Sequence, residues 1–166
     1  MLGTDHEYGA LNRTWSFVCG KLGAQYLRAP IPVPIVSAED VIDQVWSQVN
    51  ERTRLLFLSR ITSPTALILP IKPFIAKARE AGILTVIDGA HAPGMIPLDL
   101  DALGADAYAG NCHKWMMAPK GSGFLHVRRD VQHLIDALIV SWGWESDEPS
   151  SSQFVDHHEW QGTRDI

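Results

Sequence analysis

The stretch Val86–Gly123 reads VIDGAHAPGMIPLDLDALGADAYAGNCHKWMMAPKGSG, and it decides the fold. Asp88 closes an apolar run typical of a buried strand, and Lys114 follows the next such run, Ala105–Ala109. Because ligands of open parallel sheets sit beyond the carboxyl ends of the strands, we expect the carboxylate and the amine to face one crevice. Together they could hold opposite ends of a flat, ring-shaped ligand.

Strand and helix patterns alternate along the rest of the chain, which predicts an α/β fold with a mostly parallel sheet flanked by helices. Ser37 and Asp40 fit a capping box at the start of a helix, and Gly82 suits a helix C-terminus. The chain opens on a polar segment with no preceding strand or helix, and residues 146–152 are expected to form a loop or linker. The other predicted strands are 25–27, 54–59, 83–87 and 124–127, and the predicted helices are 11–22, 38–49, 73–81 and one from about 130.

Size and charge narrow the class of protein. The 166 residues, 46% of them hydrophobic, are enough for one core-bearing domain. A net charge of −5 without a basic run argues against binding nucleic acid or an anionic membrane. There is no apolar run near the roughly 18–20 residues of a membrane span and no signal-like start, so a cytoplasmic enzyme is expected. No Cys/His spacing indicates a metal site, and His157-His158 is interpreted as a solvated pair.

Five motifs occur in order along the chain: TSPT (62–65), DGAHAPG (88–94), HKW (113–115), PKGSGFL (119–125) and GTRD (162–165). They cover almost the whole chain, and together they resemble the class V aminotransferase family of pyridoxal-phosphate-dependent enzymes. SWGW (141–144) with the final EWQGTRDI is similar to the isopenicillin N epimerase-like branch.

This resemblance implies the large domain of a fold-type I pyridoxal-phosphate-dependent transferase, in incomplete form. Residues 1–145 would be a partial cofactor-binding domain. Residues 146–166 would be a linker and the start of the segment leading to a C-terminal small domain. We therefore expect the chain to be a fragment of a longer enzyme and to be inactive alone.

The resemblance also implies roles around the ring of pyridoxal 5′-phosphate. Lys114 would form the Schiff base and later carry the Cα proton of the substrate. Asp88 would keep the pyridine nitrogen protonated, and His91 would lie near the phenolic oxygen or over the ring. Tyr8 would stack on the other ring face, with His6 as the competing candidate.

The phosphate and the phenolic oxygen need polar partners. The resemblance implies Asn111 and His113 for the phosphate, and Thr163 for the phosphate of a neighbouring subunit, so that a homodimer would share its active sites. Thr62 and Ser63 would bond near the phenolic oxygen, although a Ser before Pro64 is also an ordinary turn.

Two positions depart from the family pattern. Ala66 stands where many relatives have glycine, which would alter the backbone there. Arg60 stands where histidine is frequent. It could offer its charge to a substrate or phosphate, or pair with an acidic neighbour.

The implied substrate is an amino acid that loses its Cα proton. Reprotonation on the opposite face would give an isomerase, loss of a β or γ substituent a lyase, and protonation at C4′ a transaminase, that is, a transferase. A cysteine desulfurase or C–S lyase of the same family is the alternative. A truncated, non-catalytic copy that dimerises or binds is the alternative from another class.

Overall fold

The computed structural model describes residues 1–162. Contacts divide the chain into two compact units, Met1–His126 and a second that begins at Val127. The predicted division at residue 145 stays a prediction. No helix among residues 1–162 has the length and apolar character that crossing a membrane requires.

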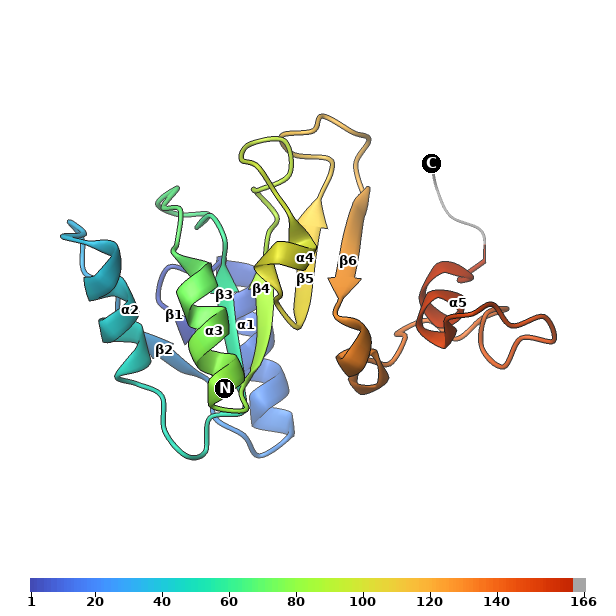
Figure 1. Cartoon of the computed structure of the whole chain (residues 1–166), viewed down its shortest axis with the longest axis horizontal. Helices are drawn as coiled ribbons and strands as arrows, with labels where there is room; N and C mark the ends of the chain where they lie inside the picture. Colours follow the sequence, from blue (N-terminus) through green and yellow to red (C-terminus); the bar gives the residue numbers. More distant parts are fainter. Residues whose placement is uncertain (163–166) are drawn as a thin grey trace. The chain divides into compact units, whose positions relative to one another are not determined.

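The first unit is built on a six-stranded sheet in the order β2-β1-β3-β4-β5-β6 (Figure 1). All the registered pairs from β2 to β5 are parallel. The arrow of β6 runs opposite to that of β5 in Figure 1. The predicted α/β fold with a mostly parallel sheet is therefore confirmed. The strands are β1 (Leu2–Thr4), β2 (Leu27–Ala29), β3 (Leu55–Ser59), β4 (Leu84–Asp88), β5 (Ala107–Asn111) and β6 (Gly123–Val127).

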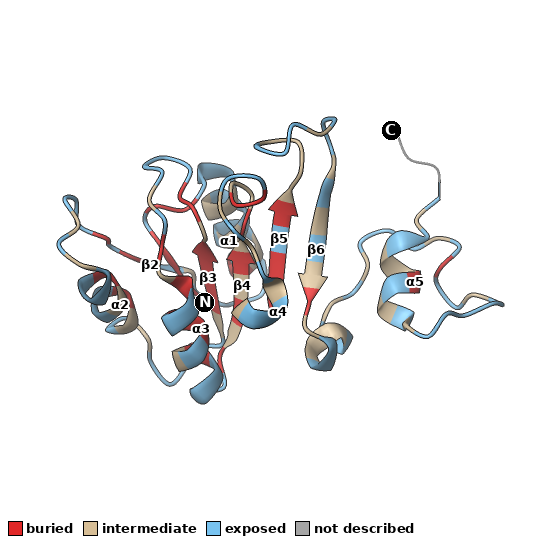
Figure 2. Cartoon of the chain, turned by 45° about the horizontal axis from the view of Figure 1, so that its top comes forward, coloured by how far each residue is buried: buried red, intermediate tan, exposed pale blue. Residues whose placement is uncertain are grey.

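Helices cover both faces of the sheet. Successive residues of a strand point to opposite faces, so each central strand packs against helices on both sides. Leu56 and Leu58 of β3 belong to the main core with the helices α2 and α3. Phe57, between them, packs its ring against Trp15 of α1 at 5.3 Å. Figure 2 shows burial concentrated in the central strands. The helices are α1 (Gly9–Lys21), α2 (Ala38–Trp46), α3 (Ile71–Glu80), α4 (Leu100–Leu103), the 3₁₀ helix η1 (Arg129–Leu134) and α5 (Gln153–Glu159).

Local end signals account for α2 and α3. The Ser37 hydroxyl accepts a hydrogen bond from Asp40 N at 3.0 Å, which confirms the predicted N-cap. Gly82 follows α3 with φ 66°, as a glycine after a helix end commonly does. Pro73 was expected as the first helical residue, but α3 begins at Ile71. Proline is tolerated there because N–H groups of the first turn have no partner inside the helix.

Other predicted elements were wrong in type or place. The helix expected from about Asp130 is the 3₁₀ helix η1, and the strand expected at 25–27 is β2 at Leu27–Ala29. The opening segment, in which no strand was placed, contains β1, which pairs with β2 in parallel. Such three-residue strands carry too short a pattern to be recognised alone, and sheet pairing defines them. Residues 146–152 form the expected loop, and α5 follows it.

Candidate active site

A cavity of about 420 Å³ lies at the carboxyl ends of the central strands. Register places Ser59 beside Asp88, and Asp88 beside Ala109, so β3 and β4 end level and β5 continues a little further, to Asn111. The loop after β1 and the start of α1 close the other side. The polar side chains on its wall are those of Tyr8, Ser59, Ser63, Asp88, His91, Asn111 and Lys114, and the larger apolar ones are those of Leu11, Trp15, Phe57, Ile61, Val86 and Ile87.

Lys114 and Asp88 both line this cavity, as the sequence predicted. One carboxylate oxygen of Asp88 accepts a hydrogen bond from Ala90 N at 2.9 Å, which holds the side chain at the strand end. The main-chain oxygen of Asp88 accepts from Arg60 N at 2.7 Å. The acid and the amine that were predicted to face one crevice thus lie on the wall of the same cavity.

His91 lies between two side chains of the HKW segment. Its Nε2 is 3.1 Å from Lys114 Nζ, and its Nδ1 accepts a hydrogen bond from the indole N–H of Trp115 at 3.2 Å. Burial lowers the pKa of His91 below its ordinary value, and the charge of Lys114 lowers it further against the opposing effect of Asp88. The neutral imidazole is thus the favoured form.

Gly94 lets the loop after β4 approach the HKW segment. Its φ is 80°, and a Cβ added there would lie 2.8 Å from the carbonyl carbon of Trp115. A side chain would therefore force the two loops apart. The glycine of the DGAHAPG motif thus sets the distance between His91 and the HKW segment.

Tyr8, rather than its competitor His6, reaches the cavity. Tyr8 is 52% exposed and lines the wall. His6 is buried elsewhere, with Nδ1 at 2.9 Å from Thr65 Oγ1 and Nε2 at 3.0 Å from Ile31 O. The stacking role of Tyr8 stays a prediction, but His6 already has both ring nitrogens engaged.

The candidate phosphate and phenolic-oxygen partners divide into two groups. Ser63 and Asn111 line the cavity. Thr62 is buried in its own loop, where its hydroxyl accepts from Leu67 N at 2.8 Å. His113 holds Nδ1 at 3.0 Å from Ser122 O. Thr62 and His113 are not part of the wall as the structure describes it.

Thr163, the candidate for a shared phosphate site, lies outside the described residues. The binding roles of Thr62, Ser63, Asn111, His113 and Thr163 stay predictions.

The two departures from the family pattern have distinct local outcomes. Ala66 adopts φ 54°, so the left-handed backbone that favours glycine is kept with an alanine. Arg60 donates from Nη1 to Leu69 O at 2.7 Å, on the loop that follows β3. Its guanidinium thus bonds main chain and is not on the cavity wall.

Glu7 is a residue that the sequence interpretation missed. It is 2% exposed and accepts hydrogen bonds from Ser59 N at 2.8 Å, from Ser59 Oγ at 2.5 Å and from Thr4 Oγ1 at 2.6 Å. Burial raises its pKa, and the bonds from Ser59 and Thr4 oppose the rise. Glu7 ties the segment that carries Tyr8 to the end of β3. Nothing in the local pattern indicates that this carboxylate is buried.

Trp15 was also missed, although a signal existed. It stands four positions after Leu11 on the predicted helix, so the two share one helical face, and both line the cavity. Its indole Nε1 is buried and has no hydrogen-bond partner within the described chain. Trp15 and Phe57 give the cavity a broad apolar wall.

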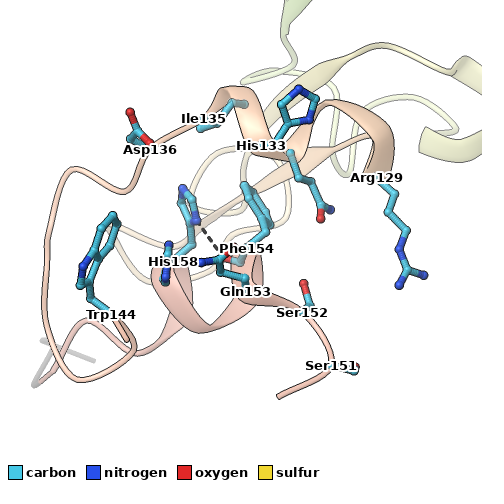
Figure 3. Close-up of a pocket in the computed structure, with 12 residues that line it drawn as sticks. Arg129, His133, Ile135, Asp136, Trp144, Ser151, Ser152, Gln153, Phe154 and His158 are labelled. Atoms are coloured by element: carbon cyan, nitrogen blue, oxygen red, sulfur yellow. Dashed lines mark hydrogen bonds between the residues drawn. The ribbon is translucent and has the colours of Figure 1, made fainter. Parts of the chain in front are cut away.

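A second cavity, of about 440 Å³, lies within the unit that begins at Val127 (Figure 3). Trp144 stacks on His157 at 4.3 Å and Phe154 on His158 at 4.1 Å, while His158 Nδ1 lies 2.8 Å from Phe154 O. Across residues 1–162, no group of three His, Cys, Asp or Glu residues is placed to hold a metal ion. The histidine pair here is engaged in ring stacking.

Comparison with known proteins agrees with this geometry. The family model for class V aminotransferases matches residues 3–144. The chain belongs to this family. Isopenicillin N epimerases from Amycolatopsis lactamdurans and Streptomyces clavuligerus are 39% and 36% identical over 176 residues. Each match covers 100% of the chain and 44% of the relative, so the chain spans less than half the length of these curated relatives. The family and branch predicted from the motifs are confirmed.

More distant relatives widen the range of chemistry. A putative L-cysteine desulfhydrase from Oryza sativa subsp. japonica is 31% identical over 169 residues, which are 96% of this chain and 34% of that protein. The solved structure of the cystine C–S lyase C-DES with cysteine persulfide superposes with a TM-score of 0.77 at 25% identity. That match covers 94% of this chain and 46% of the lyase. A cysteine desulfurase from Escherichia coli, at 20% identity and a TM-score of 0.72, shares the fold.

Proposed function

We propose that this chain is the cofactor-binding part of a pyridoxal-phosphate-dependent enzyme that removes the Cα proton of an amino acid and delivers a solvent-derived proton to the opposite face. The observation that carries the proposal is that Lys114 and Asp88 line one cavity from neighbouring strand ends. Membership of the family indicates pyridoxal phosphate as the cofactor. The epimerase relatives, which match the whole chain, favour epimerisation among the reactions of the family.

The residues present fit this cofactor. A cavity of about 420 Å³ is within the ordinary range for small-ligand sites, roughly 300–1,000 Å³. Its broad walls, Trp15 and Phe57 among them, are apolar, while an amine and a carboxylate provide the polar groups that orient a ligand. A flat ring with a basic nitrogen and an aldehyde matches this distribution of groups.

When bound, pyridoxal phosphate supplies an aldehyde carbon for an amine and a conjugated ring that takes up the electron pair left by the Cα proton. Lys114 would be the amine that engages the aldehyde carbon, and when freed by the substrate it would accept a proton from Cα. The carboxylate of Asp88 would hold a proton at the ring nitrogen. Tyr8 would pack beside the ring, and Ser63 and Asn111 would offer hydrogen bonds from the wall.

The test is cofactor binding by the chain and two lysine variants. Wild-type chain mixed with pyridoxal phosphate should show the visible absorption of a lysine-linked cofactor. Lys114→Ala should abolish that absorption. Lys120→Ala, an exposed position in the same loop region, should leave it unchanged. Equal absorption from the wild type and Lys114→Ala would rule out the assignment.

The reaction itself is tested by hydrogen exchange at Cα. The chain with cofactor is incubated with single amino acids in D₂O, and deuterium at Cα is measured by mass spectrometry and chiral chromatography. Deuterium with inversion supports the epimerase. A longer protein that carries these residues and binds the cofactor, but shows no exchange with any amino acid, would contradict the proposal.

C–S lyase chemistry is the second candidate, because the desulfhydrase and the solved lyase share nearly the whole chain. Sulfide release from cysteine, faster than Cα exchange with inversion, would favour it. If the chain is instead a non-catalytic remnant, it should fold and bind no pyridoxal phosphate. The homodimer with a shared site is a further proposal, tested by sedimentation of the chain with and without the cofactor.

A further inference from the structure

The order of the strands in the sheet reverses between β1 and β3. From β1 the chain crosses to β2 on one side, and from β3 it continues through β4 and β5 on the other. In open α/β sheets, ligands bind in the crevice at such a reversal, beyond the carboxyl ends of the strands. The segment after β1 and the end of β3 border this crevice, and both contribute to the wall of the cavity of about 420 Å³.

Glu7 occupies the crevice behind the cavity wall. Leu2 of β1 pairs with Leu56 of β3, so β1, which ends at Thr4, stops one residue short of Ser59. The main-chain N–H of Ser59 donates to Glu7 Oε2 at 2.8 Å. The same carboxyl group accepts from the hydroxyls of Ser59 and Thr4, at 2.5 Å and 2.6 Å. The side chain of Glu7 thus takes the place that a longer β1 would have beside β3.

This arrangement does not require one charge state of Glu7. An ionised carboxylate accepts all three hydrogen bonds. A carboxyl group protonated on Oε1 can donate to the Thr4 hydroxyl and still accept both bonds from Ser59 at Oε2. The connection between the loop after β1 and the end of β3 is therefore present in either form.

Tyr8 depends on this connection for its place on the cavity wall. Its side chain is 52% exposed and makes no capping hydrogen bond at the start of α1, so the backbone that carries it largely determines where the ring lies. On the helix side, Asn12 donates to Tyr8 O at 3.0 Å and to Glu7 O at 3.2 Å. On the sheet side, the Glu7 side chain bonds to Ser59, which also lines the cavity.

We propose that Glu7 is a positioning residue of the candidate active site, which holds the ring of Tyr8 against the bound cofactor from behind the wall. The presence of that cofactor rests on the proposed function above. Glu7 does not line the cavity, but the next residue along the chain, Tyr8, and its hydrogen-bond partner, Ser59, both do. It acts on the ligand through these two residues.

The first measurement is ¹⁹F NMR of the full chain labelled with 3-fluorotyrosine, and it needs no cofactor. The chain has three tyrosines, and the Tyr8 signal is assigned by its loss in Tyr8→Phe. In Glu7→Leu the Tyr8 signal should narrow and move toward the shift of the unfolded chain, because the loop is released from β3. Glu7→Gln, which can keep a partner for each bond, should restore the wild-type signal.

The second measurement is the affinity for pyridoxine 5′-phosphate, followed by equilibrium dialysis. This ligand has an alcohol in place of the aldehyde, so its binding reports contacts with the ring without a bond to Lys114. Tyr8→Leu should weaken binding about 2–10-fold, the range expected from loss of one aromatic contact. Glu7→Leu should weaken binding to the same extent, and Glu7→Gln should bind as the wild type does.

Asp106 provides a matched control, because it is a second buried carboxyl group bonded to a strand. It accepts from Thr85 N at 2.7 Å and from Thr85 Oγ1 at 2.8 Å, near the amino ends of β4 and β5 and away from the cavity. Asp106→Leu should destabilise the chain but leave the Tyr8 signal and the affinity unchanged. If circular dichroism shows that Glu7→Leu does not fold, Ser59→Ala, which loses one bond to Glu7, should move the Tyr8 signal in the same direction but less far.

A double variant tests whether Glu7 acts through Tyr8. Glu7→Leu/Tyr8→Leu should bind pyridoxine 5′-phosphate as weakly as Tyr8→Leu alone, and a further full loss would overturn the proposal. So would a Tyr8 signal that neither Glu7→Leu nor Ser59→Ala changes, or an equal effect of Asp106→Leu. If the Tyr8 signal responds as expected but the wild type binds neither pyridoxine 5′-phosphate nor pyridoxal phosphate, the proposed function is refuted and the positioning of Tyr8 by Glu7 stands.

Discussion

Replacing Glu7 by leucine is expected to lower the free energy of unfolding by about 3 kcal/mol. The carboxylate accepts from the main-chain N–H and hydroxyl of Ser59 and from the hydroxyl of Thr4, all in a buried setting. Leucine accepts none of these bonds. A buried main-chain N–H without an acceptor costs roughly 1–3 kcal/mol, and the two hydroxyls add a smaller loss because they can rotate to other acceptors.

Glutamine at the same position is the matched control. Its oxygen can accept both bonds from Ser59, and its amide can donate to the Thr4 hydroxyl, which is also an acceptor. Because every buried group keeps a partner, Glu7→Gln should cost only about 1 kcal/mol. The contrast between the two variants isolates the hydrogen bonds from the loss of charge.

The pH dependence has a definite sign. Burial raises the pKa of Glu7 above its ordinary value of 4.5, so the folded state binds this proton more tightly than the unfolded state. The contribution of Glu7 to stability is therefore complete below about pH 4.5 and is lost as the pH rises through the raised pKa. Glu7→Gln lacks this titration, and its stability relative to the wild type should improve across that interval.

The assay is urea unfolding of the wild type and both variants, followed by circular dichroism at several pH values from 4 upward. Equal destabilisation by leucine and glutamine would refute the hydrogen-bond reasoning. A wild type that gains stability over Glu7→Gln as the pH rises would refute the burial reasoning, because it would mean that the folded state favours the charged carboxylate.

Three further outcomes follow from the same contacts. Gly94→Ala should destabilise the chain by about 1–3 kcal/mol, measured by thermal unfolding, because its Cβ would meet the Trp115 backbone; an unchanged melting temperature would contradict the close approach. Ser37→Ala should cost about 1 kcal/mol through loss of the cap to Asp40, in the same assay, whereas a change at an exposed mid-helix position should not. Asp88→Asn keeps an oxygen for Ala90 N, so the fold should be retained while pyridoxal phosphate binds about 10–100-fold more weakly in a fluorescence titration; unchanged affinity would remove the role of this carboxylate.

The sequence was most informative where a pattern is long and local. The apolar runs of β3 and β4 and the cap at Ser37 were placed within a residue or two of their observed ends. It failed where an element depends on distant partners. The short strands β1 and β2 pair with each other although α1 separates them in the sequence. The segment of η1 forms a 3₁₀ helix, although its pattern resembles that of an ordinary α-helix.

The candidate site divides in the same way. Asp88, His91 and Lys114 stand out because motifs place them directly after strands, and all three line the cavity. Glu7 and Trp15 did not stand out, because the burial of one and the cavity contact of the other arise only when the loop after β1 and α1 dock on β3.

By itself the sequence determined the α/β class, the family and the residues with reactive groups, because strand periodicity and motif spacing are written along the chain. Only the tertiary structure decided between Tyr8 and His6 as the aromatic group at the cavity, left Thr62 and His113 off its wall, and brought the indole N–H of Trp115 to Nδ1 of His91. These outcomes depend on distances between separate loops. Gly94 has no side chain and so lets its loop approach the backbone of Trp115. The spacing of residues along a single strand or helix does not predict this approach.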